Sequence, residues 1–163
     1  MDIILNHDQV QHKIRRIAYQ IYEANASEKE IILAGIAGGG YTLAQRLAEV
    51  LQDIAPMHIV LCKVQIDKKN PRSEISTSID EASYRDKAVV LIDDVLNSGT
   101  TLIYGVRHFL DVPLSRFKTA VLVNRNHKKY PVKADFKGIS LSTSLNENVA
   151  VVFGEKEDLV HLE

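Results

Sequence analysis

The sequence predicts one α/β domain built on a mostly parallel central sheet that is flanked by helices. Short apolar runs typical of buried strands alternate with amphipathic helical segments, and this strand–loop–helix order recurs along the chain. Hydrophobic residues make up 45% of the 163 positions, enough for a single continuous core. Because no repeat or low-complexity linker divides the sequence, we expect one domain over residues 1–163.

The N-terminal part predicts a helix, a strand, a glycine loop and a second helix. Four apolar residues recur at helical spacing: Val10, Ile14, Ile17 and Ile21. Asp8 is a suitable N-cap for this helix, with Gln11 as its capping-box partner. The apolar run 31–36 predicts a buried strand that ends at three glycines, after which helical spacing returns over 43–54. Residues 58–64 predict the next strand.

The remaining chain predicts a long polar loop and a second strand–loop–helix unit. The segment Asp67–Asp86 has no steady period and contains Pro71, which favours an exposed loop. Residues 88–92 are apolar on both faces, as in a buried parallel strand, and a helix is expected over 102–110. Three later strands are expected at 117–123, 139–141 and 149–153. The acidic tail 155–163 is expected to be an interface or a frayed end.

The acids Asp93 and Asp94 follow the strongest predicted strand, and a small hydroxyl-rich turn follows them. Ligands gather at the carboxyl ends of parallel strands. Gly99 permits a tight turn, and the coming helix offers unpaired N–H groups that suit a phosphate. Adjacent carboxylates suit ribose hydroxyls or Mg²⁺. The arrangement predicts a site for a ribose 5-phosphate; the alternative is a solvated strand end with Ser and Thr residues that cap the helix.

This segment resembles the signature of type I phosphoribosyltransferases, in which a hydrophobic strand, two acids and a Thr-Gly-Thr-like phosphate loop follow one another. Asn97 and Ser98 replace the commoner residues of that loop. Further blocks resemble the uracil phosphoribosyltransferase and pyrimidine-operon regulator branch (PyrR), at residues 16–18, 33–36, 43–48, 93–96, 121–127, 131–136 and 143–144. The resemblance implies the type I phosphoribosyltransferase fold with a small hood region.

The resemblance also implies an enzyme that transfers the phosphoribosyl group of 5-phosphoribosyl-1-pyrophosphate (PRPP) to a nucleobase, uracil or a related pyrimidine, and releases pyrophosphate. Asp93 and Asp94 would be the catalytic residues. They would bind the ribose hydroxyls and hold Mg²⁺ directly or through water. The 5-phosphate would be bound by Asn97, Ser98, Gly99, Thr100 and Thr101. The pyrophosphate loop would be Ala37, Gly38, Gly39 and Gly40, without the basic side chain usual in the branch. The hood over the base would be Val123, Asn124 and Arg125. A flexible lid over about 67–86 would contribute Lys68, Lys69 and Arg72.

Two other classes of function remain open. One is a catalytically weak, nucleotide-sensing RNA-binding regulator on the same fold, favoured by two basic clusters. These clusters are His12, Lys13, Arg15 and Arg16, and Arg125, His127, Lys128, Lys129 and Lys133. The other is a phosphoryl-accepting receiver domain, which would place its acid pair after the first strand instead. The glycines do not follow the G-x-G-x-x-G or G-x-x-x-x-G-K-[ST] pattern, which disfavours a dinucleotide or Walker-type nucleotide site.

Composition narrows the setting in which the protein works. The formal net charge of −1 provides no general attraction to polyanions, so RNA contacts would have to be local. A single cysteine, Cys62, lies within an apolar run, and no apolar stretch reaches the length of a membrane span. We therefore expect a cytoplasmic protein with no membrane partner, and the resemblance implies a homodimer or tetramer. The histidines lack metal-ligand spacing.

Overall fold

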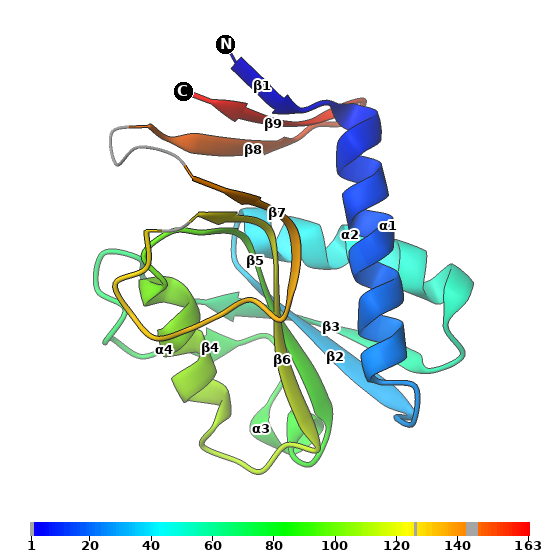
Figure 1. The fold of residues 1–163 in the computed structure, drawn as a ribbon. Helices are drawn as coiled ribbons and strands as arrows, with labels where there is room; N and C mark the ends of the chain where they lie inside the picture. The colour runs from blue at the N-terminus through cyan, green and yellow to red at the C-terminus, as the bar shows by residue number, and fades with distance from the viewer. Residues whose placement is uncertain (1, 126, 143–146) are drawn as a thin grey trace.

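The computed structural model describes residues 2–125, 127–142 and 147–163, and its centre is a six-stranded sheet (Figure 1). The strand order is β4-β3-β2-β5-β6-β7. The strands are β2 Glu30–Ile36, β3 His58–Gln65, β4 Ser76–Thr77, β5 Ala88–Leu96, β6 Arg116–Arg125 and β7 Phe136–Leu141. Only β4 runs antiparallel to its neighbour, which confirms the mostly parallel sheet. The resemblance block at 143–144 lies outside the described residues.

Helices cover both faces of this sheet. Helices α1 His7–Ala24 and α2 Gly39–Ile54 lie on one face, and α3 Glu81–Tyr84 and α4 Thr100–Phe109 on the other (Figure 1). Strand residues alternate between the two sides, so that Leu33 packs in the core beneath α1 and α2 while Ile32 packs in the core beneath α4. None of the helices in the described residues is long and apolar enough to cross a membrane.

A separate three-stranded antiparallel sheet forms the hood. It consists of β1 Asp2–Leu5, β9 Asp158–Leu162 and β8 Val149–Phe153, with β9 in the middle (Figure 1). Residues 123–125, expected in the hood, are instead the last residues of β6 in the main sheet. The tail is likewise ordered, because residues 158–162 pair with both β1 and β8. The expectation of a frayed end was wrong.

Helix α1 begins earlier than the sequence pattern predicted. Asn6, not Asp8, is the N-cap: its side chain accepts from the Gln9 backbone N–H at 2.9 Å, and the Gln9 side chain accepts from the Asn6 N–H at 2.9 Å. Both residue pairs have capping-box spacing, so spacing alone could not separate them. The earlier start follows from β1, which ends at Leu5 and leaves the next residue to begin the helix.

The segment 67–86 is only partly the loop that its composition predicted. Residues 76–77 form β4 on the edge of the main sheet, and α3 follows. Tyr84 is only 3% exposed, and its ring packs edge-on against Phe109 at 5.0 Å between centroids. An isolated aromatic residue in a polar stretch gives no periodicity, which explains why its anchoring role was missed.

Asp158 fastens the hood to the helices beneath it. This carboxylate is 3% exposed and accepts from Gln11 Nε2 at 2.7 Å and from Arg46 Nη2 at 3.2 Å. We expect Asp158→Ala to lower the free energy of unfolding by about 1.5–3 kcal/mol, because it leaves the buried side of Arg46 without its carboxylate. Urea denaturation measures this loss, with the exposed neighbour change Glu157→Ala as control. Equal stability of the two variants would contradict the fastening role.

Candidate active site

A cavity of about 300 Å³ opens where β5 ends and α4 begins. Its lining comes almost entirely from the segment that carries the sequence signature. The lining residues are Lys68, Asp93, Asp94, Val95, Leu96, Asn97, Ser98, Gly99, Thr100, Thr101, Leu102, Val121 and Val149. The acid pair and the hydroxyl-rich turn therefore share one cavity, and the hood strand β8 contributes Val149 to its wall.

The two acids differ in their surroundings. Strand β5 runs on to Leu96, so both acids lie within the strand, and Asp93 is only 5% exposed, which contradicts the alternative of a solvated strand end for this residue. Asp93 Oδ1 accepts from the Asp94 N–H at 2.9 Å, and Asp94 Oδ1 accepts from the Val95 N–H at 2.8 Å. Burial, and then the adjacent Asp94 carboxylate, raises the pKa of Asp93 to about 8, although the charge of Lys68 opposes this.

The glycine loop packs directly on the acid pair. Gly38, with φ of +96°, is the N-cap of α2. A Cβ on Gly39 would lie 2.1 Å from Asp94 Oδ2, and one on Gly40 would lie 2.7 Å from the Ile92 carbonyl oxygen. Side chains at 39 and 40 would therefore push into the acids or their strand. The structure brings the predicted pyrophosphate loop and acid pair together, with the start of α2 beside Asp94.

The hydroxyl-rich turn forms the start of α4. Its N-cap, Gly99, has φ of +86° in the left-handed region and provides no side-chain cap, while Ser98 Oγ accepts from the Thr100 N–H at 3.3 Å. Ser98 Oγ and Thr100 Oγ1 share a hydrogen bond of 2.8 Å, and the Ser98 carbonyl accepts from the Lys129 N–H at 2.7 Å. The turn is thus fixed from outside while the helix start faces the cavity, the arrangement that suits a bound phosphate.

The candidate lid cations do not act as one group. Lys68 lines the cavity beside the acids. Lys69 is exposed, and its backbone N–H donates to Asp67 Oδ1 at 2.9 Å. Arg72 lines a different hollow, of about 180 Å³, against the end of α4 with Arg107 and other residues. In this conformation only Lys68 of the three is positioned to meet a ligand at Asp93 and Asp94.

The three residues predicted to contact the base are buried at the end of β6. Asn124 is 5% exposed and donates from Nδ2 to Ser140 Oγ at 3.3 Å. Arg125 is 6% exposed, and its Nη1 donates to Asn97 Oδ1 at 3.0 Å. None of the three lines the cavity as it stands. Val121 and Val149 do, and sequence reasoning missed both because an apolar strand residue gives no sign of whether it faces a core or a cavity.

Comparison with known protein families covers nearly the whole chain and identifies the family to which it belongs. Residues 1–158 match the family model described as the phosphoribosyl transferase domain. The chain belongs to the phosphoribosyltransferase family.

Curated relatives refine this assignment within the phosphoribosyltransferase family. The protein named Bifunctional protein PyrR from Fusobacterium nucleatum is 34% identical, over 99% of this chain and 98% of the relative. Its namesake from Corynebacterium glutamicum is 35% identical, over 93% of this chain and 85% of the relative. This chain is therefore a phosphoribosyltransferase of the PyrR branch, which confirms the resemblance seen in its sequence blocks.

Solved structures of phosphoribosyltransferases share the fold. The hypoxanthine phosphoribosyltransferase of Trypanosoma cruzi superposes with a TM-score of 0.78 at 15% identity, covering 99% of this chain and 96% of that one. A hypoxanthine-guanine phosphoribosyltransferase from Bacillus anthracis gives a TM-score of 0.74 at 19% identity, covering 87% and 83%. At these identities the likeness concerns the fold alone, and it confirms the type I phosphoribosyltransferase architecture.

The acid pair could hold Mg²⁺ together with a phosphorylated ligand. In each carboxylate Oδ1 accepts a backbone hydrogen bond. In the described part of the chain no three His, Cys, Asp or Glu side chains gather as a metal site. Mg²⁺ usually takes one or two carboxylates and completes its shell with waters and ligand phosphates, a role that these two adjacent carboxylates suit.

Proposed function

We propose that this protein transfers the phosphoribosyl group of PRPP to uracil or a related pyrimidine, as a cytoplasmic homodimer or tetramer that uses Mg²⁺. The observation that carries the proposal is the single cavity in which Asp93 and Asp94 meet the open N-terminus of α4. A ribose 5-phosphate needs hydroxyl acceptors and a phosphate site a few ångströms apart, and this cavity supplies both.

In the proposed reaction, a ring nitrogen of the base attacks the anomeric carbon and gives up its proton, while the bond from that carbon to the pyrophosphate oxygen breaks and pyrophosphate leaves with the electron pair. Positive charge develops on the sugar in the transition state. The turn at 97–101 would hold the 5-phosphate, and Asp93 and Asp94 would hold the ribose hydroxyls in the cavity. The glycines at the start of α2 would let the pyrophosphate approach the backbone closely, and Lys68 would add a positive charge. Positioning and charge would do most of the catalysis. Bound Mg²⁺ would supply charge neutralisation for the departing pyrophosphate.

Calorimetric titration with PRPP and Mg²⁺, followed by a uracil turnover assay on the same sample, tests this proposal. Binding with turnover is the expected result. Binding of PRPP or of uridine monophosphate without turnover would reassign the protein to a nucleotide-sensing regulator. If the protein bound neither PRPP nor uridine monophosphate, the proposed function would be overturned.

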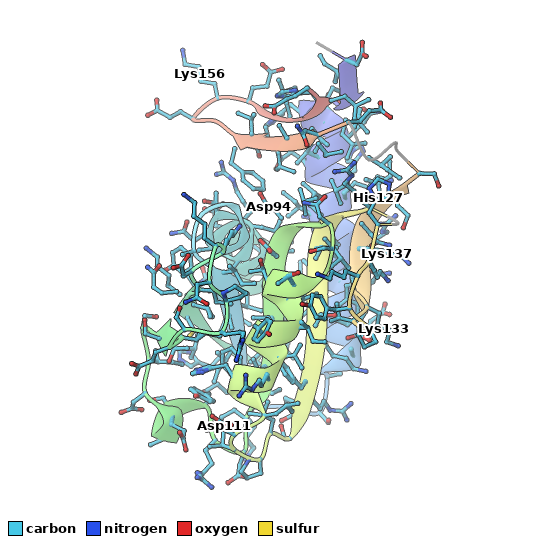
Figure 2. All side chains as sticks on the ribbon, turned by 90° about the vertical axis from the view of Figure 1, so that its left-hand side faces the viewer. Asp94, Asp111, His127, Lys133, Lys137 and Lys156 are labelled. Carbon is cyan, nitrogen blue, oxygen red and sulfur yellow. The ribbon has the colours of Figure 1, made fainter. Side chains whose placement is uncertain are left out.

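RNA binding is a second candidate, favoured by the packing of α1 against β7. Arg16 Nη2 donates to the carbonyl oxygens of Lys137 and Gly138, at 2.7 Å each. This contact holds Arg16 against β7, and Figure 2 shows Lys137 of β7 along one edge with His127 and Lys133 of the late basic segment. Arg125 is buried and so leaves the surface cluster. The two clusters predicted separately could then contact one RNA.

We expect the paired change Arg15→Gln and Lys128→Gln to weaken binding of the protein to a pyrimidine-operon leader RNA and to flatten its salt dependence. Each lost phosphate contact lowers the slope of log Kd against log salt by about 0.7 for single-stranded RNA. Both side chains are exposed and come from the two different segments. Filter binding between low and moderate salt gives the slope, with Lys156→Gln, on the remote hood tip in Figure 2, as control. An unchanged slope would exclude this surface.

A further inference from the structure

Arg125 is a buried cation that joins the phosphate turn to the hood. It ends β6 and is 6% exposed. Nη1 donates to Asn97 Oδ1 at 3.0 Å, and Nη2 donates to the carbonyl oxygen of Glu147, just before β8, at 2.6 Å. Charge-assisted hydrogen bonds of this kind are strong and directional, and burial strengthens them further. Asn97, the first residue of the phosphate turn, therefore has its side chain fixed from behind.

Arg125 determines which way the Asn97 amide faces. A guanidinium group carries only donors, so the amide must turn its oxygen toward Arg125. The NH₂ group then lies on the opposite side of the amide. No partner for Asn97 Nδ2 occurs among residues 2–125, 127–142 and 147–163, and Asn97 lines the cavity. The cavity wall thus carries two N–H donors whose orientation is set by a residue that does not line it.

We propose that Asn97 donates to an acceptor oxygen of the bound ligand, and that Arg125 is the positioning residue that holds the Asn97 amide for this task. This rests on the proposed function, since the ligand is the phosphoribosyl compound or its nucleotide product. The acceptor is an oxygen of the 5-phosphate or a carbonyl of the base. Arg125 accordingly acts on the ligand through Asn97, a role different from direct reading of the base.

Two variants at position 97 separate the two roles of Asn97, which are to accept from Arg125 and to donate to the ligand. In Asn97→Asp the carboxylate still accepts from Arg125, so its Tm should equal or exceed that of the wild type, whereas Asn97→Ala should lower the Tm. Both variants lose the N–H donors, and both should bind uridine monophosphate, which carries the phosphate and the base carbonyls, about tenfold more weakly, the effect of one lost hydrogen bond. Asn148→Ala, an exposed asparagine outside the cavity, is the matched control.

Calorimetry with ribose 5-phosphate and with uridine monophosphate identifies the acceptor. Equal loss of affinity for both compounds in Asn97→Ala points to the phosphate, and loss for the nucleotide alone points to the base carbonyl. Arg125→Met should weaken binding of uridine monophosphate in the wild-type background but add nothing to Asn97→Ala. Wild-type affinity in Asn97→Ala, or a further full loss in the double variant, would overturn the inference while the proposed function stands. If the wild-type protein bound none of PRPP, ribose 5-phosphate and uridine monophosphate, the proposed function itself would be overturned.

Discussion

Asp93→Asn is expected to weaken binding of PRPP with Mg²⁺ by about tenfold to a hundredfold, the effect of lost charged hydrogen bonds, and yet to stabilise the protein at alkaline pH. The gain follows from burial, which with Asp94 raises the pKa of Asp93 from 3.8 to about 8. The unfolded chain ionises this group near its ordinary pKa, so folding becomes less favourable as pH rises from about 4 to about 8. The cost is fully present above pH 8. Asparagine carries no charge at any pH and keeps the hydrogen bond from the Asp94 N–H.

Denaturant unfolding in the presence of a chelator, at pH 5 and pH 9, measures the first half of this result. The difference in stability between Asp93→Asn and wild type should widen at pH 9 by a few kcal/mol, since each tenfold change in proton affinity corresponds to about 1.4 kcal/mol. Asp111→Asn, at an exposed position distant from Asp94 in Figure 2, should change neither stability profile nor binding. Calorimetry measures the expected loss of affinity for PRPP with Mg²⁺. A variant that binds PRPP as the wild type does would remove Asp93 from the site.

Gly39→Ala is expected to leave the fold intact and to reduce PRPP affinity by more than about tenfold, by displacing a charged group that binds the ligand. Gly39 lacks a positive φ, so alanine fits its backbone and gains up to about 1 kcal/mol of helix propensity. The added Cβ would stand 2.1 Å from Asp94 Oδ2, the end of a side chain that can rotate away. Displacement of this carboxylate removes a ribose or Mg²⁺ ligand while costing little stability.

Thr42→Val is the control for this experiment, because it changes the same helical turn without approaching the acids. Calorimetry and thermal unfolding of both variants, together with Gly39→Ala in an Asp94→Ala background, separate the causes. If Gly39 acts by making room for Asp94, the glycine change should have no further effect on affinity once the carboxylate is gone. An equal loss in both backgrounds would indicate that the glycine backbone itself meets the ligand.

Local sequence patterns predicted the parts of this protein that depend on neighbours in the chain. The run 88–101 gave the buried strand, the acid pair and the turn, and all of its later residues line one cavity. Its boundary was misplaced because Val95 and Leu96 continue the strand past two carboxylates, which propensity alone disfavours. The burial of Asp93 could not be foreseen, since it results from Gly39 and Gly40 packing against β5 from another helix.

Features that join distant segments were not readable from the sequence. Arg72 and Lys68 stand four positions apart in the same polar stretch, yet they line different hollows. The hood required residues 2–5, 149–153 and 158–162 to be paired, and no periodicity connects them. The resemblance implied a hood but placed it at the end of β6. Only tertiary packing decides which cation lines the cavity and which segments form the hood, because each segment taken alone is compatible with either position.

The hood also has a kinetic meaning. Its strand β1 joins β9 across nearly the whole chain, as in the pairing of Asp2 with Leu162, whereas β8 pairs with its neighbour β9, and β2, β5 and β6 pair across intermediate separations. Contacts of such long range are slow to form because the intervening chain must be ordered first. The main sheet and its phosphate turn are therefore expected to fold before β1 pairs with β9 and completes the hood. The pairing of β1 with β9 would also be expected to open before the main sheet in native-state hydrogen exchange.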